Sequence, residues 1–158
     1  MYRPIGIIHS PYREAAKTPI QPKYAPGIRA QIEIFPEYIE GLKDLNGFSH
    51  IYLIYHFHEA SSPKLRVVPY LDEVERGIFS TRAPNRPNPI GISIVAVKAI
   101  EGNKIEVEGC DILDGTPLLD IKPYVERFDH IPDTNKGWHE HISEETAKRK
   151  GSRKENNP

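Results

Sequence analysis

The residues best suited to chemistry lie in a polar, proline-rich segment between Gly77 and Gly91. Its hydroxyl, guanidinium and amide side chains belong to Thr81, Arg82, Asn85, Arg86 and Asn88. Pro84, Pro87 and Pro89 fix their own φ angles and restrict the residues that precede them. Such restraint reduces the entropy that is lost when a loop orders around a ligand. The segment is therefore predicted to be a preorganised binding loop. The alternative is a proline-rich connection whose arginines are merely solvated.

A second polar turn reads Asp-Ile-Leu-Asp-Gly-Thr-Pro over residues 111–117. Gly115 permits a positive φ, and Pro117 restricts the chain that follows. The turn carries two carboxylates, Asp111 and Asp114, although Asp114 could instead cap its own turn. The two polar segments flank one predicted hairpin. Both ends of this hairpin could therefore meet over one barrel opening, where ligands commonly bind.

The elements that would position these residues are mostly short strands. Apolar residues alternate with polar ones over residues 28–34, which predicts a half-buried strand. Residues 92–100 and 104–112 form the clearest hairpin, joined through Glu101-Gly102-Asn103. The longest apolar run, 48–57, is predicted to be a central strand buried on both faces. Further elements are expected as strands at 5–8, 65–70 and 118–121, helical turns at 36–45, and a helix at 143–150 capped by Ser143.

Six or seven short strands separated by turn residues are typical of antiparallel all-β folds. We therefore predict a mainly β protein, an antiparallel barrel or sandwich with a few short helices, and the antiparallel β-barrel is the fold implied by the family resemblance given below. The barrel domain is expected over residues 1–128. A polar C-terminal extension over residues 129–158 is expected to be partly helical, with a frayed end from residue 151. The sequence has no G-x-G-x-x-G fingerprint, phosphate loop or G-x-S-x-G elbow, which argues against a Rossmann fold and a serine hydrolase.

Composition limits the partners and the compartment. The formal net charge of −1 gives no global attraction to nucleic acid, so RNA would be held by local patches or by paired subunits. The single cysteine, Cys110, excludes an internal disulfide and is compatible with the reducing cytosol, so we expect a cytoplasmic protein. No apolar stretch approaches the roughly 20 residues of a membrane span, and the first residues lack a signal-peptide pattern. No membrane association is predicted.

Three histidines, His50, His56 and His58, lie on one face of the predicted central strand. The His56-x-His58 pair could share a metal ion, but no H-E-x-x-H motif or cysteine pair accompanies it. Hydrogen-bonded strand histidines are the alternative, and no bound metal is predicted. A small metal-dependent hydrolase that uses His56, His58 and aspartates is kept as a further hypothesis.

Two longer strings resemble the TrmO family of tRNA methyltransferases. They are Thr-Arg-x-Pro-x-Arg-Pro-Asn-Pro-Ile-Gly at 81–91 and Asp-Ile-Leu-Asp-Gly-Thr-Pro-Leu-Leu-Asp-Ile-Lys-Pro-Tyr at 111–124. Gln21-Pro22 and the run from Phe48 to His58 resemble the other signatures of the family, so the resemblance spans about residues 3–125. It implies an S-adenosylmethionine-dependent, homodimeric β-barrel enzyme. Its reaction would methylate the exocyclic amine of threonylcarbamoyladenosine beside the anticodon of tRNA.

The resemblance also implies site residues. The implied cofactor-binding set is Gln21, Phe57, His58, Arg82, Ile92, Asp111, Ile112, Leu113 and Asp114. Arg82 could fork onto the cofactor carboxylate, an aspartate could accept from ribose hydroxyls, and Phe57 offers an apolar face for a ring. Ile92 would contribute backbone contact, and backbone groups around Leu113 could read the adenine edge.

Catalysis and substrate choice are predicted to use other groups. A group that accepts a hydrogen bond from the attacking amine would localise the lone pair of the amine nitrogen. Asn88 or Asp114 could serve as this catalytic acceptor. The threonyl carboxylate of the modified base needs a cation, and Arg86, Lys122 and Tyr124 are the predicted substrate-binding residues. Basic residues of the tail, Lys148 to Lys150 with Arg153 and Lys154, could add phosphate contacts or be solvated. The alternative function is a barrel that holds an adenosyl ligand or RNA without catalysis.

Overall fold

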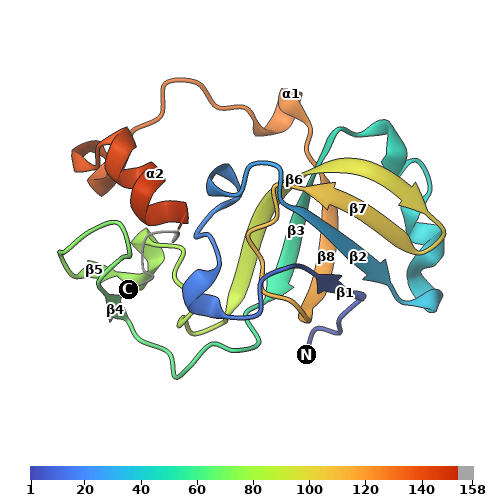
Figure 1. Ribbon diagram of the computed structural model, residues 1–158, viewed down its shortest axis with the longest axis horizontal. Coiled ribbons are helices and arrows are strands. Elements are labelled where there is room, and N and C mark those ends of the chain that lie inside the picture. Colours follow the sequence, from blue (N-terminus) through green and yellow to red (C-terminus); the bar gives the residue numbers. More distant parts are fainter. Residues whose placement is uncertain (153–158) are drawn as a thin grey trace.

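The computed structural model describes residues 1–152, and six antiparallel strands close into a barrel in the order β1-β2-β7-β6-β3-β8 (Figure 1). These strands are β1 (Gly6–His9), β2 (Arg29–Ile34), β3 (His50–His56), β6 (Ile90–Glu101), β7 (Lys104–Glu108) and β8 (Thr116–Pro123). A separate hairpin pairs β4 (Arg66–Val67) with β5 (Arg76–Gly77). The predicted antiparallel β-barrel is confirmed.

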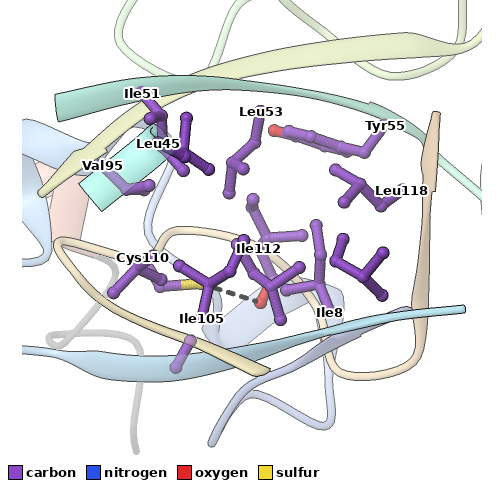
Figure 2. Close-up of a cluster of buried hydrophobic side chains, with 14 residues drawn as sticks. Ile8, Leu45, Ile51, Leu53, Tyr55, Val95, Ile105, Cys110, Ile112 and Leu118 are labelled. Carbon is purple, nitrogen blue, oxygen red and sulfur yellow. Dashed lines mark hydrogen bonds between the residues drawn. The ribbon is translucent and has the colours of Figure 1, made fainter. Parts of the chain in front are cut away.

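Alternating side chains of the strands point into the barrel and form its core (Figure 2). In β7, Ile105 and Val107 are fully buried, whereas Glu106 and Glu108 lie on the outer face. In β2 the same period of two buries Ile32 and Ile34. The predicted hairpin also forms, because Gly102 adopts a φ of 58° in the turn between β6 and β7.

Burial of β3 differs from the prediction. Its inward residues Ile51, Leu53 and Tyr55 are buried, but His50 and His56 on the other face are exposed. A closed barrel has only one interior, so the outer face of a strand is covered only where other segments lie on it. The Tyr124 ring provides part of this cover, with its centroid 5.9 Å from that of Tyr52. The prediction of burial on both faces was therefore wrong.

The second arm of the hairpin is shorter than predicted. It ends at Glu108 because Gly109 adopts a φ of 87° and its N–H donates to the Ile28 carbonyl at 2.8 Å. Cys110 and Ile112 then turn inward and join the core (Figure 2). The change of direction brings residues 110–112 to one end of the barrel instead of extending the strand.

Helices are short and lie outside the barrel. The 3₁₀ segments are η1 (Ala15–Lys17), η2 (Pro22–Tyr24), η3 (Pro36–Leu42), η4 (Leu45–Gly47), η5 (Ile78–Ser80) and η6 (Gly137–His141). The α-helices are α1 (Glu126–Asp129) and α2 (Glu144–Ser152), and Ser143 Oγ caps α2 by accepting from Thr146 N–H at 3.1 Å. Gly151 and Ser152 belong to α2, while the rest of the predicted frayed end, 153–158, lies outside the described residues. No helix within residues 1–152 is long and apolar enough to cross a membrane.

The contact between β1 and β2 leaves no room for a side chain at Gly6. A Cβ there would lie 2.3 Å from the backbone oxygen of Glu33. Gly6→Ala should therefore lower the free energy of unfolding by about 1–3 kcal/mol through overpacking. The matched control is Gly41→Ala, since a Cβ at Gly41 would meet no atom within 4 Å. Urea unfolding checks this, and equal stability of both variants would contradict it.

Candidate functional site

One end of the barrel gathers most of the predicted site residues. In the antiparallel register His56 pairs with Ile90 and Tyr55 with Leu118, so the end of β3 lies beside the starts of β6 and β8. Phe57 N–H donates to the Pro89 carbonyl at 2.8 Å, which joins the end of β3 to the proline-rich loop. The turn that follows β7 reaches the same end. Segments far apart in sequence therefore meet there.

Asp111 is a buried carboxylic acid at this end. It is 7% exposed, and its Oδ1 accepts a 2.6 Å hydrogen bond from Ser93 Oγ. Ser93 Oγ also lies 3.0 Å from the Tyr55 hydroxyl, so the ionised form of Asp111 orders a chain of donors from Tyr55 through Ser93. Burial raises the pKa of Asp111 to about 7, although the Ser93 hydrogen bond and the charge of Arg82 oppose this rise. Burial likewise raises the pKa of Tyr55, which keeps its hydroxyl neutral.

Arg82 and Gln21 come from distant loops and contact each other. Arg82 Nη1 donates to Gln21 Oε1 at 2.7 Å. The charge of Arg82 also reaches Asp111, because it lowers the pKa of that carboxyl. The arginine side chain is exposed, so its guanidinium can take a further anionic partner. The predicted cofactor residues Gln21, Arg82 and Asp111 are thus brought together.

The proline-rich loop is held by its own hydrogen bonds. Arg86 Nη1 donates to the carbonyls of Thr81 at 3.0 Å and of Ala83 at 3.1 Å. Asn85 Oδ1 accepts from Ser61 N–H at 2.9 Å and ties the loop to the segment after β3. Asn88 is exposed, and its side-chain amide has no hydrogen-bond partner among residues 1–152. Arg86 therefore braces the loop, while Asn88 remains available to a ligand.

The carboxylate of Asp114 anchors its turn to the first loop. Its Oδ1 accepts from Ser10 N–H at 2.9 Å, and its Oδ2 forms an ion pair with Arg13. The Asp114 N–H also donates to the Tyr12 carbonyl at 2.8 Å. Both carboxylate oxygens are engaged, so these contacts favour the structural alternative for Asp114 over its predicted role as a proton acceptor.

Ile112 and Leu113 differ in what they can offer a ligand. The Ile112 side chain is 2% exposed and packs in the core, which leaves only its backbone near the barrel end. The carbonyl of Leu113 accepts from Thr116 Oγ1 at 2.6 Å. Within the described chain the N–H of Leu113 has no partner. An unpaired backbone donor beside Asp111 is the group that could read the edge of a heterocycle.

The Phe57 ring packs over Gly91 of β6, beside the ring of Tyr55. The two rings meet edge-on, with centroids 5.4 Å apart and an interplanar angle of 82°. Gly91 allows this packing, since a Cβ there would lie 2.3 Å from the Tyr55 ring and 2.9 Å from the Phe57 ring. Phe57 is half-buried and retains an accessible part. The exposed His58 follows directly.

Ile92 can contribute backbone groups but not its side chain. The Phe57–Pro89 and Val97–Ser49 hydrogen bonds show that the odd-numbered residues of β6 direct their backbone N–H and C=O groups at β3. The N–H and C=O of Ile92 therefore point to the opposite edge, where pairing with β7 starts only at Ala96. Its side chain is 44% exposed on the outside of the barrel.

Lys122 and Tyr124 lie at the other end of the barrel. Lys122 pairs in register with Tyr52, and Tyr124 N–H donates to the His50 carbonyl at 3.0 Å. Phe57 is the fifth residue after Tyr52, which corresponds to about 17 Å along an extended strand. The Lys122 ammonium is also 3.0 Å from an Asp120 carboxylate oxygen. The structure therefore does not bring these two predicted substrate residues to the end of the barrel that carries Phe57.

The strand histidines do not assemble a metal centre within residues 1–152, where no group of three or more His, Cys, Asp or Glu could hold a metal ion. His50 and His56 are both exposed. His50 Nδ1 lies 2.9 Å from Ser49 Oγ, which agrees with the alternative of a hydrogen-bonded strand histidine. The metal-dependent hydrolase therefore has no support in the described chain.

Sequence reasoning missed several residues that shape the site. Ser93 is a polar residue at an inward position of β6, between Gly91 and Val95, and this break in the apolar face was a usable signal. Tyr55 lies within the run 48–57, which is predicted to be a buried strand, and Tyr55 is not itself a predicted site residue. Ser10 and Arg13, which hold Asp114, carry no pattern that links them to a residue about 100 positions later.

The titration of Asp111 predicts a pH dependence of stability. Its pKa rises from 3.8 to about 7 on folding, so the folded state holds the proton more tightly. The stability that the protonated carboxyl provides is complete at low pH and is lost as pH rises through 7. Asp111→Asn cannot ionise and escapes this loss. Relative to the wild type, its free energy of unfolding should therefore rise by up to about 1.4 kcal/mol per pH unit between pH 3.8 and about 7. Denaturant titrations between about pH 4.5 and 8 test this. A constant difference between the two proteins would contradict it.

Comparisons with known proteins agree with this architecture. The family model described as tRNA-methyltransferase O N-terminal domain matches residues 7–130. A Pyrococcus abyssi protein named as a probable S-adenosyl-L-methionine-binding protein is 56% identical over 137 residues, covering 87% of this chain and 74% of its own. A mouse protein named tRNA (adenine(37)-N6)-methyltransferase is 37% identical over 133 residues, covering 80% of this chain and 31% of its own.

A solved structure shares the fold. The crystal structure of TrmO from Pseudomonas aeruginosa superposes with a TM-score of 0.73 at 38% identity, covering 87% of this chain and 62% of that chain. The chain therefore spans less than two thirds of that protein and about a third of the mouse relative. The predicted resemblance is confirmed by a family match that covers most of the barrel. The chain belongs to the tRNA-methyltransferase O N-terminal domain family.

Proposed function

We propose that this protein is an S-adenosylmethionine-dependent methyltransferase that acts on tRNA, at the exocyclic amine of threonylcarbamoyladenosine next to the anticodon. The observation that carries the proposal is the meeting of Gln21, Phe57, Arg82 and Asp111 at one barrel end. Family membership and the name of the mouse relative support the reaction and the position of the base. A cytoplasmic location accords with a tRNA substrate and is part of the proposal.

The residues present fit the chemistry of S-adenosylmethionine. Arg82 has an exposed guanidinium for the carboxylate of the cofactor, and Gln21 orients it through the 2.7 Å hydrogen bond. Asp111 offers a buried carboxylate for ribose hydroxyls or for a positive sulfonium. Phe57 provides an aromatic edge, and the unpaired N–H of Leu113 provides a donor for the adenine. His58 and the backbone of Ile92 complete the proposed contacts.

When bound, S-adenosylmethionine supplies an electrophilic methyl group. The protein then has to hold the attacking amine in line with the bond between sulfur and the methyl group and to exclude water. Positioning therefore provides most of the catalysis. Asn88 is the residue we assign to the amine, because its amide oxygen is exposed and lacks a partner in the described chain. By accepting from the amine N–H, Asn88 would localise the lone pair that otherwise delocalises into the purine. Asp114 is assigned to holding the turn.

Arg86 is the proposed partner of the threonyl carboxylate. Only its Nη1 is used to brace the loop, so the other guanidinium nitrogens can still donate to an anion. Lys122 and Tyr124 could serve the same substrate only from a second subunit or through RNA that extends along the barrel. Their separation from Phe57 makes a role in the same protomer inconsistent with the register of β3 and β8.

Calorimetry and methyl transfer test the proposal with three full-length variants. Arg82→Ala should raise the Kd for S-adenosylmethionine about tenfold or more, since it removes a charged hydrogen bond. Asn88→Ala should lower kcat about 100-fold with little change in cofactor Kd. The control is Arg66→Ala, an exposed arginine of β4 whose ion pair with Glu75 lies outside the barrel. Transfer to tRNA with and without the threonylcarbamoyl group tests the substrate. No binding at millimolar cofactor would overturn the proposal.

A barrel that binds S-adenosylmethionine without catalysis is the alternative, and the name of the Pyrococcus abyssi relative, a binding protein, favours it. The two functions differ in one outcome of the same experiment. Binding that Arg82→Ala weakens, without methyl transfer to modified tRNA, would support the alternative. Binding together with transfer that Asn88→Ala reduces would support the enzyme.

We further infer a homodimer formed through the isoleucine strip, defined as Ile90, Ile92 and Ile94. These side chains are 40%, 44% and 39% exposed and follow one another on the outer face of β6. Large apolar side chains in a row are typical of an interface, and a twofold axis would pair each strip with its copy. The strip also adjoins the proposed cofactor site, so a second subunit would cover that end of the barrel.

Ile94→Glu should convert the dimer into monomers, because it would bury a charge in the contact. Sedimentation equilibrium measures the change. The control is Ile131→Glu, the same substitution at an isoleucine that is 71% exposed and lies outside the strip. A monomeric wild type, or a dimer that Ile94→Glu leaves intact, would contradict this interface.

A further inference from the structure

The C-terminal segment contacts both loops that carry the Gln21–Arg82 pair. The family model matches only as far as residue 130, so η6 and α2 lie beyond the matched barrel. Figure 1 shows α2 away from the closed barrel, and α2 contacts η2 of the first loop. Trp138 of η6 lies against Arg76 of β5. The position of these two helices is therefore unexplained by barrel folding alone.

The first contact is made by Trp138 of η6. Its Nε1–H donates to the Ser80 carbonyl at 2.8 Å, two residues before Arg82. Its ring stacks on His139, with centroids 3.9 Å apart, and the Arg76 guanidinium lies 5.7 Å from the ring centroid. Arg76 is itself held by Asp72 at 2.8 Å. Trp138 is thus fixed on both sides, and its single donor is directed at the backbone that leads into Arg82.

The second contact is made by the last turn of α2. The Gly151 carbonyl accepts from Ile20 N–H at 3.1 Å, immediately before Gln21. Gly151 also lies against the Tyr24 ring, since a Cβ there would be 2.5 Å from a ring carbon. Ala147, one turn earlier, is 8% exposed. The buried small residues of α2 therefore let the helix dock closely on η2.

The two contacts bracket one hydrogen bond. Gln21 is adjacent to the residue held by α2, and Arg82 is two residues from the one held by Trp138. The Arg82–Gln21 bond joins the two loops at 2.7 Å. A long arginine in an exposed loop loses substantial rotamer entropy when it binds a ligand. Restraint of both loops from outside would reduce that loss before the ligand arrives.

We propose that residues 137–152 act as a clamp, in which Trp138 and Gly151 position Arg82 and Gln21 for the anionic end of the ligand without touching it. The proposal rests on the proposed function for its ligand, S-adenosylmethionine. The clamp explains why a segment outside the matched barrel packs against these two loops.

The test uses full-length variants that alter each contact separately. Trp138→Phe keeps an aromatic ring but removes the N–H donor. Gly151→Ala places a methyl group against Tyr24, and because alanine favours helix more than glycine does, the helix itself is not weakened. Glu145→Ala is the matched control, an exposed residue of α2. Each contact variant should raise the cofactor Kd and KM about fivefold, the effect of one neutral hydrogen bond, with kcat unchanged. Glu145→Ala should bind like the wild type.

A double variant separates positioning from general stability. In the Arg82→Ala background, Trp138→Phe should have no further effect on Kd, because the clamp acts through Arg82. A purely structural role predicts instead a lower melting temperature, an unchanged Kd in the single variants, or equal effects of Trp138→Phe in both backgrounds. Any of these three results would overturn the proposal.

Hydrogen exchange without ligand makes failure of the clamp distinguishable from failure of the proposed function. Amides of residues 15–27 and 77–86 should exchange faster in Trp138→Phe and Gly151→Ala than in the wild type and Glu145→Ala. If the wild type binds no S-adenosylmethionine while exchange still increases, the proposed function fails and the restraint of the loops stands. If the wild type binds the cofactor but exchange and Kd do not change in the variants, the clamp is refuted.

Discussion

Closure of the sheet through β8 is the constraint on which the site depends. β8 pairs with β1 on one side and with β3 on the other, and every pairing in the barrel is antiparallel. The segments that leave β3 and β7 must then lie at the same end as those that enter β6 and β8. Loops that are distant in sequence are thereby gathered without a glycine-rich phosphate loop or a long helix. The interior behind them is apolar, so Asp111 enters it only with Ser93 as its partner.

Much of the barrel could be predicted because its strands obey a period of two. The alternation in β2 and β7, the turn at Gly102 and the cap at Ser143 depend on neighbouring residues, and such local signals are readable in one sequence. The grouping of the polar loop with Asp111 was also predictable, since both flank one hairpin. These inferences needed only the chain order and the assumption that the strands form one sheet.

The features that could not be predicted required knowledge of register or of distant partners. Periodicity cannot tell that the outer face of β3 lacks a second layer, nor that Gly109 ends β7 early. The separation of Lys122 from Phe57 follows from the pairing of Lys122 with Tyr52, which no local pattern encodes. The engagement of Asp114 by Ser10 and Arg13 is equally non-local. Residue types therefore identified candidate site residues. Only the tertiary contacts could show which of them anchor the fold and which are available to a ligand.

The extra length of β6 has a consequence for the solution behaviour of the protein. Beyond the end of β7 at Glu108, the backbone groups of Ile92 face an edge that no described strand extends. Such an edge is a template on which a foreign strand could add, and the outward isoleucines would favour that association. Pro89 does not block this edge, because its carbonyl accepts from Phe57 N–H on the β3 side. The shortness of the edge, which ends where β7 pairs at Ala96, is then what protects the protein against edge-to-edge aggregation.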